Sequence, residues 1–315
     1  MENSMELKSL TFEFEVVTPM FLAGEKQKKG QGRIEFRVPS LRGVLRWWFR
    51  ALAGGLVDGD VKKIVKLETG VFGGSGENAG QSRVLLRAGT LIDRSEIDSF
   101  HPLPRRENVP FDGITPGTKL QVTVSSNPYY GDDAYFDTRL SFLEVAWLLG
   151  GLGRRSRRGF GSFQPVARKF LTRDDLASTI TEAIDGARQT LGEHTEHNVS
   201  ETASRPEFPT VSQKACFIGI GKEYGGWEDL IKDVMNAIHE GIESGSISQK
   251  IIGSLNPRQG SSLVVAAKSL SNRRIVPVFS LFLTKTATGQ ITEEEWERAA
   301  RFIEKNFDVV QVPLR

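Results

Sequence analysis

Residues 150–163 read GGLGRRSRRGFGSF, and we call this stretch the glycine–arginine loop. Its glycines permit positive φ values and close approach of another backbone, because they lack a Cβ atom. Its arginines carry planar guanidinium groups that match phosphate oxygens and stack on bases. These arginines are Arg154, Arg155, Arg157 and Arg158. We expect an open and strongly cationic loop to bind a polyanion, and we favour nucleic acid; the alternative is a solvated basic turn.

Overall composition is that of an ordinary globular protein. The chain has 315 residues, a hydrophobic fraction of 39% and a formal net charge of +2. This length predicts two domains, each large enough to bury a core. Because the net charge is so small, the case for nucleic acid rests on where the basic residues lie.

Cysteine usage and hydropathy exclude several classes of protein. Cys216 is the only cysteine, so no disulfide can form within the chain, and a cysteine-rich zinc site is excluded. This usage suits a reducing cytosol, and we expect a cytoplasmic protein. The N-terminal residues lack the basic start and apolar core of a signal peptide. No apolar run is long enough to span a bilayer, so we expect no membrane partner.

Before the glycine–arginine loop, the apolar pattern alternates between strand and helix periodicity. Residues 10–17 alternate as in a strand, and a helix is predicted over 41–53 with Ser40 as its N-cap. The side chains that helical spacing turns toward the core are Leu41, Leu45, Trp48 and Leu52. Further strands are predicted at 83–91, 119–125 and 162–170, and a second helix at 138–149. The resulting order, β-α-β-β-α-β, is the ferredoxin-like motif.

The second half of the chain repeats a comparable order. Residues 172–205 are polar and are interpreted as an inter-domain helix and linker. Strand patterns follow at 215–220, 262–267, 276–284 and 309–312, and helical patterns at 227–242 and 292–307. The last helix begins with a capping box, since Thr292 is followed three residues later by Glu295. We predict an α+β protein with two tandem ferredoxin-like domains, at 1–171 and 206–315.

The predicted helix at 41–53 carries a second, basic stripe made of Arg42, Arg46 and Arg50. Ser40 and Gly43 lie at its start, where free N–H groups favour an anion. We expect the stripe to contact RNA; the alternative is that its aliphatic stems cover the helix flank and its charges pair with acids. Trp47, Trp48 and Phe49 are adjacent and cannot all face inward, so one of them is a candidate stacking surface.

Two further sets of residues complete the candidate RNA interface. Lys26, Lys28 and Lys29 form a cationic arm, for which a plain solvated loop is the alternative. Gly153, Gly159 and Gly161 are expected to let the RNA backbone approach the glycine–arginine loop or to supply its φ values.

Catalytic and cofactor signatures are scarce. The chain contains neither G-x-x-x-x-G-K-[ST] nor H-E-x-x-H. His194 and His197 lie three residues apart in a polar segment, which indicates a solvated pair rather than a metal site. Asp132 and Asp133 are interpreted as turn formers. No histidine lies in the glycine–arginine loop, where a metal-free ribonuclease would need its general base, so we predict no catalytic residue, metal or cofactor.

Several segments together resemble the RAMP superfamily of CRISPR proteins. They are TPMFLAG (18–24), PSLRGVLRWWFRAL (39–52), FGG (72–74), ITPGTKL (114–120) and the glycine-rich loop. The Trp-Trp-Phe-Arg-Ala helix combined with the glycine–arginine loop is most similar to the first subunits of the Cmr module, the type III-B RNA-targeting complex. The resemblance is strong over about the first 170 residues. In the second domain the counterpart of the loop is GSLNPRQGSS (253–262), which matches more weakly.

The resemblance implies a non-catalytic RNA-binding subunit that acts in antiviral defence. Its implied partners are guide RNA, target RNA and other RAMP subunits, and no homo-oligomer is expected. One alternative is a guide-processing endoribonuclease of the same superfamily. Another is a tandem RRM-like RNA-binding protein unrelated to CRISPR, although the RRM aromatic signature is missing from the sequence.

Overall fold

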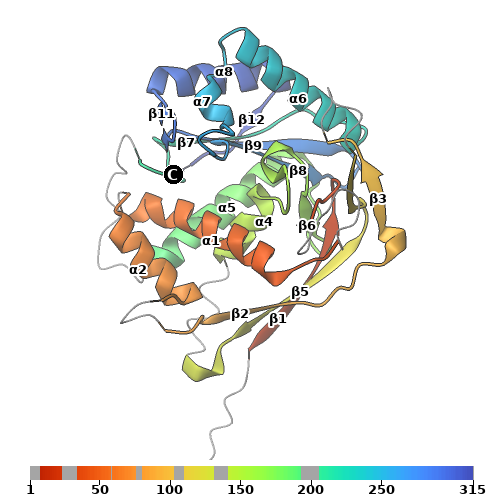
Figure 1. Ribbon diagram of the computed structural model, residues 1–315, viewed down its shortest axis with the longest axis vertical. Helices are drawn as coiled ribbons and strands as arrows, with labels where there is room; N and C mark the ends of the chain where they lie inside the picture. The colour runs from red at the N-terminus through yellow and green to blue at the C-terminus, as the bar shows by residue number, and fades with distance from the viewer. Residues whose placement is uncertain are drawn as a thin grey trace, which may run out of the picture.

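A computed structural model of the chain describes residues 8–22, 34–57, 59–75, 80–102, 110–130, 141–192 and 206–314. The predicted lysine arm lies outside these ranges, as do the His194–His197 and Asp132–Asp133 pairs. Two four-stranded antiparallel sheets form the framework, with helices between them and on the far face of the second sheet (Figure 1). The predicted α+β class with antiparallel ferredoxin-like halves is confirmed.

The first sheet has the strand order β2-β5-β1-β6. Its strands are β1 (Ser9–Val16), β2 (Val84–Ala88), β5 (Lys119–Ser126) and β6 (Phe163–Pro165). Successive side chains of a strand point to opposite faces of the sheet. In β1, Phe14 and Val16 are buried on the inner face, while Glu13 and Glu15 are exposed on the outer face. The register places Phe14 opposite Leu120, another buried residue.

Helices of the first half pack together on the inner side of this sheet. They are α1 (Val38–Leu56), α2 (Val61–Phe72), α4 (Ser141–Leu149) and α5 (Arg173–Gly192). The strands contact α1 and α4, while α2 packs against α1 and α5 packs against both α1 and α4. The predicted core face of α1 is confirmed, since Leu41, Leu45, Trp48 and Leu52 are all buried. The predicted N-cap is wrong: α1 begins at Val38 after Arg37, and Ser40 lies inside its first turn. Proline is tolerated in a first helical turn, so Pro39 does not delay the start.

The second sheet has the order β12-β7-β9-β8 and is covered by helices on both faces. Its strands are β7 (Cys216–Ile220), β8 (Leu263–Ser269), β9 (Ile275–Phe282) and β12 (Val310–Gln311). Helices α6 (Trp227–Glu243) and α8 (Glu293–Phe307) pack on one face, and a short helix α7 (Gln249–Ile252) precedes β8. The predicted capping box of α8 is confirmed, with Glu295 N donating to Thr292 Oγ1.

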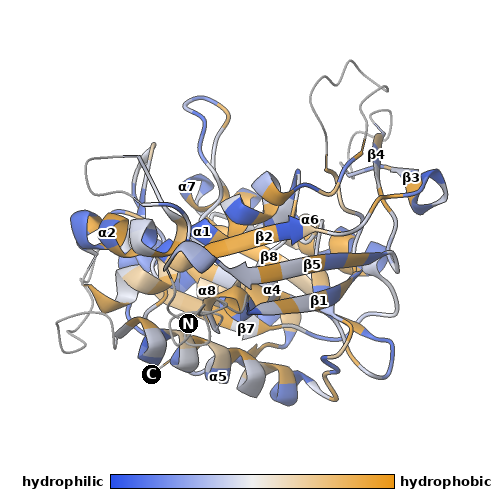
Figure 2. Cartoon of the chain, turned by 90° about the horizontal axis from the view of Figure 1, so that it is seen from below, coloured by the Kyte–Doolittle hydropathy of each residue, from blue (hydrophilic) through white to orange (hydrophobic). Residues whose placement is uncertain are grey.

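Helices of the first half also cover the second face of that sheet. Ile218 and Val278 of the second sheet belong to the same hydrophobic cluster as Leu148 of α4 and Ile180 of α5. Burial on both faces explains why the second-half strands read as nearly continuous apolar runs. The two halves therefore meet in a shared hydrophobic cluster, into which α5 packs one face. Figure 2 shows hydrophobic residues gathered where these layers meet.

Two short hairpins complete the described fold. One pairs β3 (Ile97–Phe100) with β4 (Phe111–Ile114), and the other pairs β10 (Lys285–Thr286) with β11 (Gly289–Gln290). Among the residues that the structure describes, no helix is both long and apolar enough to cross a membrane.

Lys268 of β8 is fully buried where the two halves meet. Its Nζ donates to Trp147 O at 2.5 Å, in the last turn of α4, and to Phe163 O of β6 at 2.6 Å. A neutral amine has two N–H donors, which these two carbonyls satisfy, whereas an ammonium group would carry a third. Burial lowers the pKa of Lys268 to about 7.

Stability should therefore increase with pH above neutrality. In the unfolded chain Lys268 keeps an ordinary, higher pKa, so the unfolded state binds more protons from about pH 7 up to that value. We expect the free energy of unfolding to rise by about 2 kcal/mol between about pH 7 and pH 9, relative to Lys268→Met. Urea denaturation of both proteins at several pH values measures this difference. Parallel pH profiles for the two proteins would contradict the assignment.

Candidate nucleic-acid interface

The glycine–arginine loop lies along the free edge of the second sheet. Gly159 N donates to Val265 O at 2.9 Å, and Ala267 N donates to Ser162 Oγ at 2.8 Å. Just beyond the loop, the side chain of Gln164 accepts from Ser269 N at 2.8 Å. An unpaired strand edge is a site of unwanted association, and here polar groups of the first half occupy it. The loop thereby joins β8 to the first half.

The other side of the loop is tied to the segment that follows β1. Buried Thr18 donates to Gly159 O at 2.7 Å and accepts from Ser162 N at 3.0 Å. Backbone bonds from Gly161 N to Pro19 O and from Arg154 N to Phe21 O extend this contact. Residues 18–22 of the TPMFLAG motif and the glycine–arginine loop are therefore parts of one structural unit.

The loop glycines are required by packing within the chain. A Cβ on Gly161, whose φ is +66°, would lie 1.9 Å from Leu152 O. Gly159 is buried with φ at +88°, and its Cβ would lie 2.6 Å from Ile231 Cδ1 of α6. Gly153 is exposed, but a Cβ on it would lie against the backbone carbonyl of Phe21. The expectation that glycine supplies the φ values of the loop is confirmed; close approach of RNA stays a prediction.

Two arginines of the loop bind the second half rather than pointing into solvent. Arg157 Nη1 donates to Ser261 O at 2.5 Å. Arg158 donates to Ser261 Oγ at 2.9 Å and to Ile252 O at 2.7 Å. The guanidinium of Arg157 also lies 4.8 Å from the ring centroid of Trp47, the α1 aromatic that is only half-buried. The prediction of an open loop is therefore wrong, because the second half covers one side of it.

The remaining two arginines extend the basic surface. Arg154 is exposed, and its guanidinium lies 5.6 Å from the ring centroid of Phe111 on β4. Arg155 is half-buried; its Nη2 lies 3.8 Å from Met235 Sδ, and its buried Nε has no hydrogen-bond partner within the described ranges.

The positive charge of the loop is not matched by a carboxylate among the residues that the structure describes. Within the described parts of the chain, none of the four arginines forms an ion pair with a carboxylate. Burial lowers the pKa of Arg155 and of Arg157. Burial, followed by the charges of those two neighbours, lowers the pKa of Arg158 to about 10. A bound anion would relieve both the mutual repulsion of these arginines and their unmatched charge.

The basic stripe of α1 is partly neutralised by a glutamate whose proximity no sequence pattern predicted. Glu68 of α2 is 4% exposed and accepts from Arg46 Nε at 2.6 Å and from Arg50 Nη1 at 3.5 Å. Acid pairing, the alternative reading of the stripe, is thus confirmed for these two arginines. Arg42 differs, because its Nε is buried and has no hydrogen-bond partner among the described residues.

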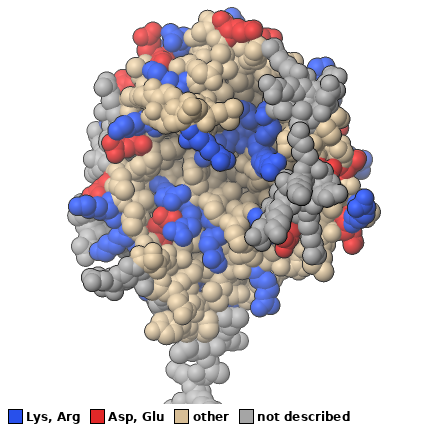
Figure 3. Space-filling view, viewed as in Figure 1, with Lys and Arg blue, Asp and Glu red and all other residues tan. Residues whose placement is uncertain are grey.

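The two sets of arginines occupy the same face of the molecule. We define the basic band as the four loop arginines together with the three on α1: Arg154, Arg155, Arg157, Arg158, Arg42, Arg46 and Arg50. The contact between Arg157 and Trp47 joins the two sets. Figure 3 shows Lys and Arg gathered across the middle of this face below α7, and again along α1, where an acidic group lies among them.

The architecture of a RAMP protein consists of ferredoxin-like halves and a glycine-rich loop. In this chain two such halves pack together, and the loop that follows α4 in the first half contacts the second half. The family model of the RAMP superfamily matches residues 13–164, which end at the β6 side of the loop. This match contains α1, α4, the whole glycine–arginine loop and most of the first sheet.

Two relatives from Pyrococcus furiosus indicate which family within the RAMP superfamily this chain belongs to. The CRISPR system Cmr subunit Cmr1-2 of Pyrococcus furiosus is 31% identical over 184 residues, covering 49% of this chain and 92% of that protein. Cmr1-1 of the same organism is 30% identical over 159 residues, and the match covers 46% of this chain and 45% of that protein. The chain therefore belongs to the RAMP superfamily and, within it, to the Cmr1 family of CRISPR type III-B subunits.

Solved structures show that the likeness in fold extends over the second half. The crystal structure of Cmr1 from P. furiosus in its apo form has a TM-score of 0.64 at 19% identity, covering 98% of both chains. A chain of the cryo-EM structure of Type III-B Cmr-beta bound to cognate target RNA has a TM-score of 0.61 at 13% identity. That match covers 96% of this chain and 99% of the other.

The loop arginines should differ in their effect on stability. Arg158→Ala removes two hydrogen bonds and leaves Ile252 O without that donor, so we expect a loss of about 1–3 kcal/mol in the free energy of unfolding. Arg154→Ala changes an exposed side chain and should alter stability by less than about 0.5 kcal/mol. Chemical denaturation compares the two. Equal stabilities would show that the contacts of Arg158 with the second half contribute nothing.

Proposed function

We propose that this chain is a non-catalytic RNA-binding subunit of a type III-B (Cmr) effector complex and that its basic band holds guide or target RNA. The observation that carries the proposal is the group of loop arginines that pair with no carboxylate among the described residues. Phosphate oxygens match the planar guanidinium fork, and a continuous polyanion can serve several arginines at once.

The setting of the band supports RNA rather than an isolated small anion. Its cations extend from the loop to α1, and an aromatic ring lies beside two of the loop arginines: Phe111 next to Arg154 and Trp47 next to Arg157. Proteins that bind single strands combine a cationic track with rings or guanidinium planes on which bases stack. Membership of the Cmr1 family supports the proposed partners, which are guide RNA, target RNA and the other RAMP subunits of such a complex.

Absence of catalysis is the second part of the proposal. The glycine–arginine loop contains glycine, arginine, serine, leucine and phenylalanine, and none of these titrates near neutral pH as a general base would. His239, on α6, lies 2.7 Å from Glu243 of the same helix, and His101 is exposed just after β3. Neither belongs to the basic band.

Salt dependence should report the phosphate contacts of the band. Arg154 and Arg42 are the arginines to replace, because neither forms an ion pair in the described structure and their loss should leave the fold intact. Each phosphate contact on a single strand contributes about −0.7 to the slope of log affinity against log salt. We expect Arg154→Ala with Arg42→Ala to flatten the slope by about 1.4, for every RNA sequence alike.

Fluorescence anisotropy with labelled single-stranded RNA across a salt series measures this slope. The matched control is Lys119→Ala with Arg301→Ala, which removes the same charge from the outer face of the first sheet and from α8. Equal slopes for the two double variants would take the band out of the RNA interface.

The isolated protein should not cleave RNA. Incubation with end-labelled repeat-containing single-stranded RNA, with and without Mg²⁺, should leave the RNA at full length, because no general base lies in the loop. A specific cut that disappears in His101→Ala would instead identify a guide-processing endoribonuclease.

A further inference from the structure

A short projecting segment lies next to the basic band. Residues 253–260, which we call the finger, connect α7 to β8. Ser254 and Gln259 exchange backbone hydrogen bonds of 3.3 and 2.9 Å, which close the finger into a turn. In Figure 2 the chain that follows α7 stands out from the molecule on the side of α1 and β2. Leu255, in this turn, is 95% exposed, more than any other large hydrophobic side chain in the described residues.

The glycine–arginine loop fixes both ends of the finger. Arg158 donates to Ile252 O just before it and to Ser261 Oγ just after it, and Arg157 donates to Ser261 O. Arg157 also packs against the backbone of the finger, because a Cβ on Gly260 would lie 2.7 Å from its Nη1. Residues of the first half therefore determine how this part of the second half is presented.

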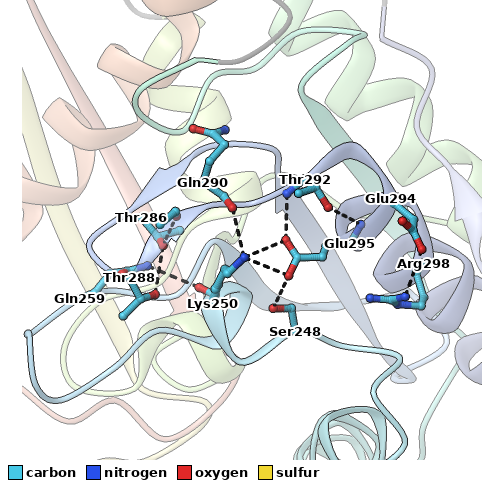
Figure 4. A network of polar contacts seen from close by, with 11 residues as sticks. Ser248, Lys250, Gln259, Thr286, Thr288, Gln290, Thr292, Glu294, Glu295 and Arg298 are labelled. Carbon is cyan, nitrogen blue, oxygen red and sulfur yellow. Dashed lines mark hydrogen bonds and ion pairs between the residues drawn. The ribbon is translucent and has the colours of Figure 1, made fainter.

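A polar network braces the finger from the other side (Figure 4). Gln259 Oε1 accepts from Ala287 N at 2.7 Å, between β10 and β11, and its Nε2 donates to Lys250 O at 3.4 Å. Lys250 Nζ in turn lies 3.2 Å from Glu295 at the start of α8. A segment fixed at its ends loses little conformational entropy when it binds, so its contacts contribute more fully to affinity.

The position and chemistry of the finger favour RNA as its occupant. Arg157 binds Ser261 O at the C-terminal end of the finger, and its guanidinium also lies over the ring of Trp47. The finger therefore borders the basic band. The finger contains no acidic residue, and it adds the exposed cation Arg258. An apolar side chain presented beside a phosphate-binding surface can pack on the faces of bases, as leucine wedges do in nucleic-acid complexes.

We propose that the finger is a second RNA contact, in which Leu255 packs on base faces and Arg258 meets a phosphate. Arg157 and Arg158 are positioning residues that present it. This inference rests on the proposed function, because it places the same RNA strand across the band and the finger.

Two matched leucine variants test the contact. Leu255→Ser and the control Leu91→Ser both alter exposed leucines, at 95% and 85% exposure, and neither should change the melting temperature. By anisotropy with a labelled mixed-sequence single-stranded RNA, we expect Leu255→Ser to bind about ten-fold more weakly, with an unchanged salt slope, and Leu91→Ser to bind as wild type. Failure of the wild type to bind RNA would overturn the proposed function and this inference together. Binding by the wild type with equal affinities for both variants would overturn the finger alone.

A double-mutant cycle tests the positioning role. In an Arg158→Gln background, at a temperature where circular dichroism shows the variants folded, Leu255→Ser should weaken binding by less than about two-fold further, because a misplaced finger has no contact left to lose. Fully additive effects would show that Arg158 does not act through the finger.

Discussion

The backbone bond from Gly159 to Val265 and the bond from Ala267 to Ser162 are the contacts on which the rest of the structure depends. They place the glycine–arginine loop on the free edge of the second sheet. Because the same loop is bound to Thr18 at the end of β1, the first half, the loop and the second sheet form one connected unit. The most cationic stretch of the first half therefore lies at its boundary with the second half.

That placement has an electrostatic consequence. Arg155, Arg157 and Arg158 are half-buried by the contact between halves, yet none of them forms an ion pair with a carboxylate in the described part of the chain. Unpaired charge in a partly desolvated setting is costly, and carbonyl groups such as Ser261 O offset only part of the cost. A polyanion across the band would complete the interaction. The same arginines determine the geometry of the finger, so structural and binding roles are combined in the same side chains.

Sequence patterns predicted the elements well where periodicity was strong. The core face of α1, the capping box of α8 and the ferredoxin-like order follow from local spacing, which acts over a few residues. The contacts that bury or pair the arginines of the candidate site join residues far apart in the sequence, so no local pattern predicts them. Glu68, Trp47 and Ser261 each meet an arginine of the band only after folding, and the partners of Arg158 lie about a hundred residues away. The sequence therefore predicted an open loop, although the second half covers one side of it.

The central claim is that RNA lies across the glycine–arginine loop on the face formed with α1. Ultraviolet cross-linking of the full chain to single-stranded RNA, followed by mass spectrometry of the cross-linked peptides, tests it most directly. The account predicts cross-links in peptides that span residues 150–163 and 253–262, with none from the outer face of β1 and β5. Cross-links confined to that outer face, or to α8, would contradict it.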